Sequence, residues 1–332
     1  MRYLITGAGG FVGSHLTIEL SKFGHQVTAL DLSFSHEVKE FFEKFSGIQL
    51  VVGSVLDVSL IDKLVKNSDY VIHLAAIASP EYYVREPKRT IDLNLNASIA
   101  IIELLRFSDK PIFYTSTSEI YGKNPNIPWT EEDSRVLGPT NINRWCYSTS
   151  KAMIEHYLYA CNQEGSLKFS GVRIFNCYGP RLKGRVVDAF IEAVIKGDKI
   201  VIHGDGMQTR CFTYIDDLIK PISQLVTSPI PTNKFYNIGT NIESTVLDLA
   251  HMVCKISGKN PDSVIKFVSH KDAIGDSYED IPRRVPDFSM AKAELQWQPT
   301  VSLEQGVQRM YEYCLSKTNS GDSVAPFREV DE

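Results

Sequence analysis

The chain has 332 residues, of which 43% are hydrophobic and 23% charged, and its net charge is −5. This length and apolar content allow one large domain or two modest ones with a sizeable core. The mildly acidic balance gives no general attraction to nucleic acid or to an anionic membrane, and no stretch approaches the roughly 20 apolar residues of a membrane span. We therefore expect no nucleic-acid partner and no membrane insertion.

Six cysteines are scattered along the chain without CxxC spacing and without a neighbouring histidine cluster. This distribution argues against a zinc site or a disulfide framework and favours free thiols in a reducing compartment. The first residues run directly into glycines and lack the apolar segment of a signal peptide. We expect no metal and a cytoplasmic location.

Short apolar runs alternate with amphipathic stretches along the first half of the chain, so that strands and helices are expected in turn. The expected strands are Tyr3–Thr6, Val27–Asp31, Ile48–Val52, Tyr70–Leu74 and Ile112–Ser116, and the expected helices are Val12–Phe23, Leu60–Lys66 and Asn94–Phe107. This alternation predicts an α/β fold with a parallel sheet and helices on both of its faces.

The alternation loosens beyond about residue 180, where a smaller C-terminal α/β lobe is expected. Helices are expected at Val186–Ile195, Asp216–Val226, Thr245–Ile256 and Leu303–Leu315, and strands at Lys199–His203 and Phe235–Ile238. We divide the chain into a cofactor-binding domain of residues 1–178, to which 212–241 returns, and a substrate-binding lobe of residues 179–211 and 242–316. The polar, acidic end, residues 317–332, is expected to be disordered.

A glycine-rich turn follows the first expected strand. Gly7, Gly10 and Gly13 stand at G-x-x-G-x-x-G spacing, with Phe11 and Val12 between the last two, and a helix is expected next. Glycine allows a tight turn and close approach of the backbone to a pyrophosphate, while the helix N-terminus offers free N–H groups to the phosphates. In this strand–turn–helix setting the spacing predicts the dinucleotide site of a Rossmann-type, doubly wound parallel sheet.

An acidic residue ends the second expected strand. Asp31 follows Gly13 by 18 residues, where a carboxylate can accept hydrogen bonds from the adenosine ribose. The same carboxylate would repel a 2′-phosphate, and residues 32–35 include no Arg or Lys to bind one. The sequence therefore favours NAD over NADP as the cofactor.

A tyrosine and a lysine, Tyr147 and Lys151, stand at Y-x-x-x-K spacing, which puts both side chains on one face of an expected helix. A phenol with a pKa near ~10 is a poor base at neutral pH, and a nearby ammonium together with a positive nicotinamide would lower that pKa. Thr117, after the strand Ile112–Ser116, can hydrogen-bond a substrate hydroxyl beside the phenol. For Thr117, hydrogen bonding at the strand end is the structural alternative.

With the glycine turn, this pair resembles the extended short-chain dehydrogenase/reductases, or NAD-dependent epimerase/dehydratase family, over nearly the whole chain. Further matching segments are His73-Leu74-Ala75-Ala76, Asn94-Leu95-Asn96-Ala97-Ser98, Tyr121-Gly122 and Arg173–Arg181. Within the family the chain is most similar to UDP-glucuronate decarboxylases, including UDP-xylose synthases, and to UDP-apiose/xylose synthases. The segments that carry this likeness are Ala78–Tyr83, Thr117–Gly122, Gly184–Val187, Gly204–Arg210 and Arg283–Asp287. The run Arg144-Trp145-Cys146-Tyr147-Ser148 resembles the apiose enzymes and the bacterial aminoarabinose decarboxylase.

The resemblance implies roles for residues outside the glycine turn. Further cofactor contacts would come from Val55, Asp57, Leu74, Ala75, Ala76, Tyr147 and Lys151. Ser118 and Glu119 stand where dehydratases have an Asp-Glu pair, so the acid that expels a C6 hydroxyl is missing and dehydration is disfavoured. Glu119 would position the sugar or handle a proton, and Arg284 would face the substrate carboxylate or supply a proton. A structural cap is the alternative for Glu119.

The resemblance also implies contacts to a nucleotide-sugar, most simply a UDP-sugar. The residues concerned are Tyr82, Asn176, Arg185, Val187, His203, Arg210 and Arg284. Arginine suits a diphosphate because its planar fork binds two oxygens at once. Surface salt bridges are the alternative for the arginines, and packing is the alternative for Tyr82 and His203. Two positions depart from the family pattern: Ser54 replaces an Asp near the adenine, and His203 stands where xylose synthases often have Tyr.

These observations predict NAD-dependent decarboxylation of a UDP-hexuronic acid, UDP-glucuronate, through a 4-keto intermediate with Tyr147 as the base. The first alternative is a nucleotide-sugar 4-epimerase, against which Glu119 and Arg284 argue. A 4,6-dehydratase, an apiose-forming ring contraction and a non-catalytic NAD-binding protein are further alternatives, and the intact Tyr147 and Lys151 argue against the last. The family resemblance implies a homodimer packed through helices at residues 94–107 and 145–162.

Overall fold

The computed structural model describes residues 1–268, 281 and 283–319. Its centre is a seven-stranded sheet in the order β11-β6-β5-β4-β1-β2-β3, in which every neighbouring pair is parallel. These strands are β1 (Arg2–Thr6), β2 (Gln26–Asp31), β3 (Ile48–Val52), β4 (Tyr70–His73), β5 (Ile112–Thr117), β6 (Phe169–Ile174) and β11 (Phe235–Ile238). The expected α/β fold with a parallel sheet is confirmed. The strand order reverses between β1 and β4, where the carboxyl ends of such sheets form a ligand crevice.

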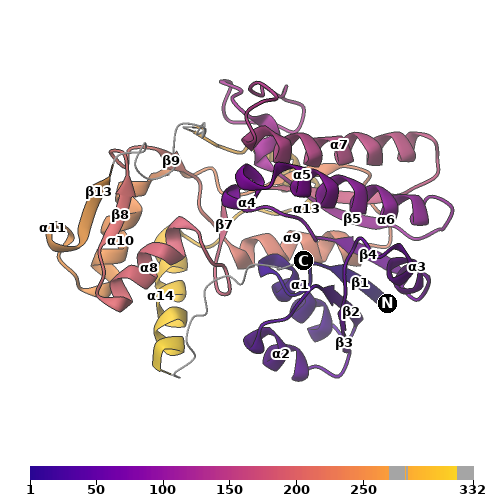
Figure 1. The fold of residues 1–332 in the computed structure, drawn as a ribbon, viewed down its shortest axis with the longest axis horizontal. Helices are drawn as coiled ribbons and strands as arrows, with labels where there is room; N and C mark the ends of the chain where they lie inside the picture. The colour runs from indigo at the N-terminus through magenta and orange to yellow at the C-terminus, as the bar shows by residue number, and fades with distance from the viewer. Residues whose placement is uncertain (269–280, 282, 320–332) are drawn as a thin grey trace.

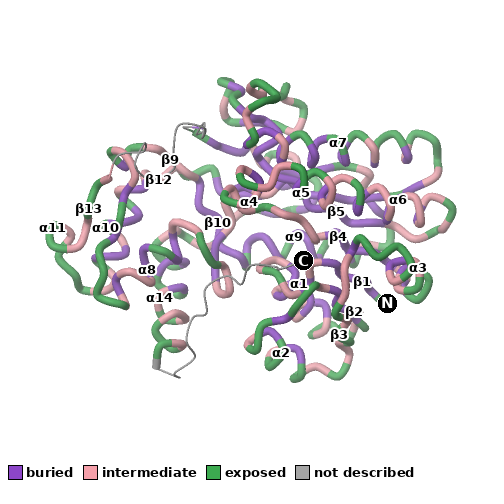
Figure 2. The backbone as a smooth tube through the Cα atoms, viewed as in Figure 1, coloured by how far each residue is buried: buried purple, intermediate pink, exposed green. Residues whose placement is uncertain are grey.

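Helices cover both faces of the sheet (Figure 1). Alternate residues of a strand point to opposite faces, so Tyr3 and Ile5 of β1 pack in one hydrophobic cluster and Leu4 in another. The first cluster is completed by α1 (Phe11–Lys22), α2 (His36–Glu43) and α9 (Ile215–Thr227), and the second by α3 (Val58–Lys66), α6 (Ser98–Leu105) and α7 (Arg144–Gln163). Figure 2 shows the buried residues concentrated between these layers and the exposed ones on the outer helix faces.

A second lobe lies beside the sheet, on the left in Figure 1. It contains α8 (Val186–Lys196), α10 (Val246–Ser257), α11 (Pro261–Val264), α14 (Leu303–Asn319) and the parallel pair β8 (Ile200–His203) and β13 (Ile265–Val268). The short ladder of β7 (Cys177–Tyr178) with β10 (Thr213–Tyr214) lies between the lobes (Figure 1 and Figure 2). The ladder of β9 (Thr209–Arg210) with β12 (Ser244–Thr245) lies in the second lobe, next to the start of α10 (Figure 2). The first hydrophobic cluster also includes Val187 of α8 and Met310 of α14, so one core is continuous across both lobes.

Some elements differ from the expectations. The expected helix Asn94–Phe107 is a π-helical turn, η1 (Asp92–Ala97), followed by α6, which ends at Leu105. The π turn coincides with the Asn94 amide, which is bonded to the Ile77 backbone. Helix α14 continues past Leu315 to Asn319, and the expected disordered tail lies outside the described residues from position 320 on. Elements that were not predicted include α2, β6, α4 (Pro80–Arg85), α5 (Pro87–Ile91), η2 (Ser118–Tyr121) and α13 (Ser289–Leu295).

Candidate active site

The glycine turn joins β1 to α1 through close backbone contacts. Gly7 has a φ of +72°, and a Cβ there would lie 2.7 Å from the Ala75 backbone nitrogen. A Cβ on Gly13 would collide with the Gly7 carbonyl oxygen. Gly10 is the N-cap of α1 and has no side chain to bond the first N–H groups of the helix. The turn thus forms a narrow backbone cradle at a helix N-terminus, which fits the pyrophosphate of a dinucleotide.

Gly9, which the sequence spacing does not single out, is tied to the predicted ribose ligand. Asp31 Oδ2 accepts a hydrogen bond from the Gly9 N–H at 2.9 Å, and Oδ1 accepts one from the Leu32 N–H at 2.7 Å. A Cβ on Gly9 would lie 2.6 Å from the Ser33 carbonyl oxygen. Burial raises the pKa of the Asp31 carboxyl, and the backbone N–H groups around it oppose that rise. The carboxylate therefore also holds the turn in shape.

The remaining predicted cofactor residues are Val55, Asp57, Leu74, Ala75 and Ala76. The N–H groups of Leu74 and Ala75 donate to the carbonyl and hydroxyl oxygens of Thr6, at 3.1 and 3.3 Å, which places this segment against the glycine turn. Asp57 is the N-cap of α3 and accepts from the Leu60 N–H at 3.0 Å. Its observed role is therefore helix capping.

A chain of buried hydrogen bonds joins the turn to the segment before α4. His73 Nδ1 pairs with Thr6 Oγ1 at 2.7 Å and Nε2 pairs with Ser98 Oγ at 2.9 Å. Because Ser98 donates its proton to the Asn94 carbonyl oxygen at 2.7 Å, it accepts from His73, whose Nε2 therefore carries the proton. The Asn94 amide bonds the N–H and C=O of Ile77 at 2.8 and 3.0 Å. Burial lowers the pKa of His73 to about 3, so the imidazole is a neutral link.

Helix α7 turns one buried face toward the end of β5, and Tyr147 and Lys151 both lie on it. Lys151 Nζ donates to the Thr115 carbonyl oxygen at 2.8 Å and lies 4.5 Å from the centre of the Tyr114 ring. Burial lowers the pKa of Lys151 to about 7. The ammonium is therefore held behind the site by a backbone carbonyl and an aromatic face.

The phenol of Tyr147 is enclosed by protein. Its ring stacks on Tyr83, with centroids 5.1 Å apart and an interplanar angle of 7°. Burial raises the pKa of Tyr147 to about 12, and the charge of Glu119 adds to the rise. The groups that oppose it are a hydrogen bond with Thr117 and the charges of Arg185 and Arg284. The sequence led us to expect a lowered phenol pKa, but among the protein's own groups burial outweighs every favourable charge.

Glu119 lies between two arginines. Its Oε2 accepts from Arg144 Nη2 at 2.9 Å, its Oε1 accepts from Arg284 Nη1, and its own N–H donates to Thr117 Oγ1 at 3.2 Å. The Arg144 side chain has no exposed surface, and those of Glu119 and Arg284 are 12% and 9% exposed. Glu119 and Arg284 both act electrostatically on Tyr147. Arg144, Glu119 and Arg284 thus form a buried Arg–Glu–Arg cluster at the phenol, with Ser118 buried beside it.

Two residues of this centre, Arg144 and Tyr83, were not singled out as functional from the sequence. Tyr83 directly follows Tyr82 in the sequence. Tyr82 was predicted to contact the substrate and lies half-buried on α4. Arg144 stands three residues before Tyr147, a spacing that shares one helix face, and this was the signal that could have found it.

Two of the predicted nucleotide-sugar residues have features that suit a ligand. Asn176 follows the carboxyl end of β6 with a φ of +36°, and its Nδ2 is buried without a hydrogen-bond partner among the described residues. Arg185 Nη2 donates to the Ala78 carbonyl oxygen at 3.0 Å, and its charge acts on Tyr147. A buried amide donor that protein leaves unsatisfied is one that a ligand oxygen can satisfy.

Two further predicted substrate residues, His203 and Arg210, lie on the second lobe. His203 ends β8, and Arg210 lies on β9, where its Nη1 donates to a neighbouring backbone carbonyl at 2.8 Å. The side chain of Val187, 1% exposed, is in the hydrophobic core, so a contact with a ligand would come from its backbone. Arg283 is exposed and pairs with Glu243.

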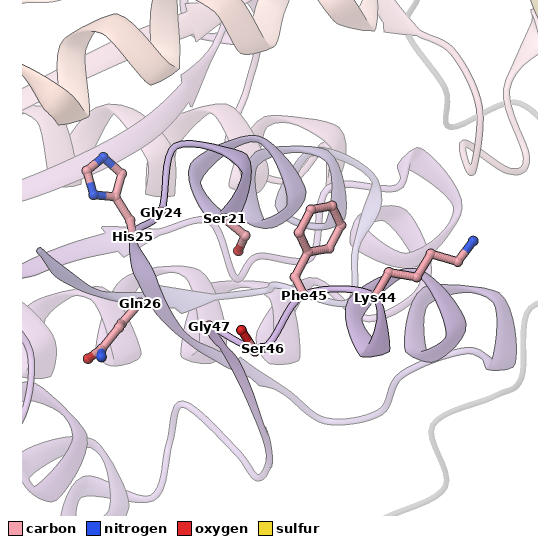
Figure 3. A pocket seen from close by; sticks show the side chains of 8 residues that line it. All are labelled: Ser21, Gly24, His25, Gln26, Lys44, Phe45, Ser46 and Gly47. Atoms are coloured by element: carbon pink, nitrogen blue, oxygen red, sulfur yellow. The ribbon is translucent and has the colours of Figure 1, made fainter.

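A hollow of about 410 Å³ lies at the other end of the sheet, where the chain enters β2 and β3 (Figure 3). It is bordered by residues 24–26 and 44–47 and contains no predicted site residue. Ligands of parallel sheets bind at the carboxyl ends of the strands, so this hollow is separate from the candidate site. Within residues 1–268, 281 and 283–319, no three His, Cys, Asp or Glu side chains gather to hold a metal ion. No helix in those ranges has the length and apolar character to cross a membrane.

The chain is similar to known proteins over most of its length. The sequence profile of the NAD dependent epimerase/dehydratase family matches residues 3–239. A UDP-N-acetyl-alpha-D-glucosaminuronate decarboxylase from Bacillus cytotoxicus is 34% identical over 316 residues, which cover 94% of this chain and 97% of the relative. The UDP-glucuronic acid decarboxylase 1 of Xenopus tropicalis is 32% identical over 315 residues, which cover 94% of this chain and 72% of the relative.

The fold is also similar to that of solved structures. The UDP-glucose 4-epimerase of Thermotoga maritima, solved with UDP-glucose, has a TM-score of 0.82 and 29% identity to this chain. The superposition covers 96% of this chain and 100% of that one.

Proposed function

Because the chain belongs to the NAD-dependent epimerase/dehydratase family, we propose that it is an NAD-dependent decarboxylase of a UDP-hexuronic acid. The observation that carries this proposal is the buried cluster of Arg144, Glu119 and Arg284 at Tyr147. Its three side chains sum to one positive charge, which suits a sugar with a carboxylate and which a neutral sugar does not require. The names of the Bacillus and Xenopus relatives support the same reaction class.

The cofactor is NAD, and the residues that would hold it are those of the glycine turn together with Asp31. Bound NAD+ supplies the acceptor for the hydride that the sugar loses at C4. Tyr147 accepts the proton of the 4-hydroxyl, and Thr117, hydrogen-bonded to the phenol, orients that hydroxyl. Lys151 stands behind the phenol on the same helix face.

Oxidation at C4 turns the uronic acid into a β-keto acid, whose carboxylate leaves as carbon dioxide because the carbonyl accepts the electrons. Arg284 would hold the carboxylate before it leaves. Glu119 would position the ring or handle the proton that C5 gains. Because Ser118 replaces the Asp of the dehydratases, no acid is available beside Glu119 to expel a C6 hydroxyl.

Purified protein incubated with UDP-glucuronate labelled at C6 tests this proposal. We expect the label to leave as carbon dioxide, with a UDP-pentose or a 4-keto sugar identified by NMR. Retention of the label with inversion at C4 would establish a 4-epimerase, the second candidate, which the similarity to the Thermotoga maritima enzyme favours. Parallel incubation with UDP-N-acetylglucosaminuronate distinguishes the two uronic acids in the relatives' names.

We further propose that residues 1–178 with 212–241 bind the cofactor and that residues 179–211 and 242–316 hold the nucleotide-sugar. The pairing of β11 with β6 supports the return of 212–241 to the first domain. To test this division, variants with a substitution in either part are titrated with NAD and, separately, with UDP. Substitutions in the first part should weaken NAD binding, and substitutions in the second part should weaken UDP binding.

We also propose that two copies associate through α6 and α7. The exposed apolar side chains Phe107, Met153 and Tyr159, on or just after these helices, support this association. Light scattering of the purified chain should give twice the monomer mass, and a monomer mass would contradict it. The six free cysteines support a reducing, cytoplasmic location, which microscopy of the tagged chain tests.

A further inference from the structure

Arg144 occupies a position that is unfavourable for a cation. It is the first residue of α7, where the helix dipole disfavours positive charge. Its side chain has no exposed surface, and removing a guanidinium from water costs free energy that a buried ion pair recovers only in part. A buried arginine at a helix N-terminus contributes little to the stability of the fold. We therefore expect its contact with Glu119, at 2.9 Å, to serve the function of the site.

One hydrogen-bond donor of Arg284 is not used by the described residues. Its Nη1 is bonded to Glu119, while its Nε is buried and has no partner among the described residues. The residue as a whole is 8% exposed. Because a guanidinium presents its donors on more than one edge, Arg284 can remain on Glu119 with one nitrogen and bind a second carboxylate with another.

A single arginine shared by two carboxylates would leave an uncompensated negative charge. Glu119 and a uronate carboxylate on one guanidinium would repel each other, and that repulsion disfavours the charged form of both. Arg144 bonds Glu119 on the oxygen that Arg284 does not use. The charges would then alternate from Arg144 through Glu119 and Arg284 to the carboxylate of the sugar.

We propose that Arg144 is a positioning residue that keeps Glu119 ionised and in place while Arg284 binds the carboxylate of the substrate. This role rests on the proposed function. It makes Arg144 a determinant of specificity for a charged sugar, because without it the remaining Glu119–Arg284 pair is neutral and attracts a uronate less strongly.

Binding measurements in the Tyr147→Phe background, where turnover is blocked, test the proposal. The NAD-loaded protein is titrated by calorimetry with UDP-glucuronate and with UDP-glucose, with and without Arg144→Met. We expect Arg144→Met to reduce the preference for UDP-glucuronate by about tenfold or more, which corresponds to ~1.4 kcal/mol, while the affinity for UDP-glucose stays nearly the same. The matched control, Arg283→Met, removes an exposed cation one residue from Arg284 and should leave the preference unchanged.

Arg144→Lys keeps the charge without the planar fork and should retain part of the preference, which guards against a methionine variant that does not fold. An unchanged preference in both variants would overturn the proposal. So would an equal loss of affinity for both ligands, since that result indicates a purely structural role. If the wild-type protein releases no carbon dioxide, the proposed function fails on its own, while the binding preference still reports on Arg144.

Discussion

Replacing Glu119 with Gln removes the charge between two buried arginines and keeps the size of the side chain. Gln has one acceptor oxygen where Glu has two, so only one of the contacts to Arg144 and Arg284 can remain. Breaking a buried ion pair from one side costs about 3–5 kcal/mol. With about 2 cal/mol/K of unfolding entropy per residue, this loss should lower the melting temperature of the chain by about 4–7 °C.

The same substitution separates the two candidate reactions. A decarboxylase should lose about 10²–10⁴-fold in the rate of carbon dioxide release, the usual contribution of a positioned acid or base. Oxidation at C4 should persist, because removing the Glu119 charge removes one cause of the raised pKa of Tyr147. Labelled carbon dioxide and NADH absorbance, followed in one reaction, measure the two steps.

Glu243→Gln is the matched control for this experiment. Glu243 pairs with exposed Arg283 and should tolerate the change with activity intact. Should Glu119→Gln release carbon dioxide at the wild-type rate, Glu119 is only a structural cap and the account of the cluster is wrong.

Three further predictions concern the cofactor turn and the groups behind the phenol. Burial lowers the pKa of Lys151 from 10.5 to about 7, so between these values the unfolded chain binds more protons and the stability from this lysine rises with pH. Lys151→Met should abolish turnover. In urea titrations its unfolding free energy should rise less between pH ~7 and ~9 than that of the wild type, and an identical rise would refute the lowered pKa of the buried Lys151 amine. The Cβ that Gly13→Ala adds would collide with the Gly7 carbonyl oxygen, so NAD binding should weaken at least ~tenfold in fluorescence titrations. An affinity equal to that of the wild type would contradict the role of the glycine turn as the pyrophosphate site. His73→Phe leaves the buried hydroxyls of Thr6 and Ser98 without their histidine partner and should lower the free energy of unfolding, measured in urea, by about 2–4 kcal/mol. An unchanged free energy of unfolding would show that this network does not stabilise the fold.

The sheet could be predicted where its strands are continuous apolar runs. The strands β1, β4 and β5 are buried almost throughout, and each contains an apolar run, Tyr3–Ile5, Tyr70–Ile72 and Ile112–Tyr114. β6 is equally buried but was not predicted, because Arg173 interrupts it and is tolerated only through its ion pair with Glu155 at 2.7 Å. That pair joins two elements that the sequence alone does not bring together. Helix α2 was missed because it is short and only Val38 and Phe42 are buried, while Phe41 packs half-buried against the core.

In the candidate site, too, the features set by residues close in sequence could be predicted, and the contacts between distant residues could not. The glycine turn and the Tyr147–Lys151 spacing are local, so their arrangement follows from the sequence. The partnership of Glu119 with Arg284 joins residues 165 positions apart, and resemblance suggested both residues but not their contact. The raised pKa of Tyr147 depends on enclosure by side chains from several elements, which no local pattern reports.

The assignment of this chain as a decarboxylase depends most directly on where the carboxylate of the sugar lies. A crystal structure of the Tyr147→Phe variant with NAD and UDP-glucuronate measures this. We predict the carboxylate within hydrogen-bond distance of Arg284, with the 4-hydroxyl facing residue 147. A carboxylate pointing away from Arg284 and Glu119, with the rest of the sugar bound in the same crevice, would contradict the assignment of this chain as a decarboxylase.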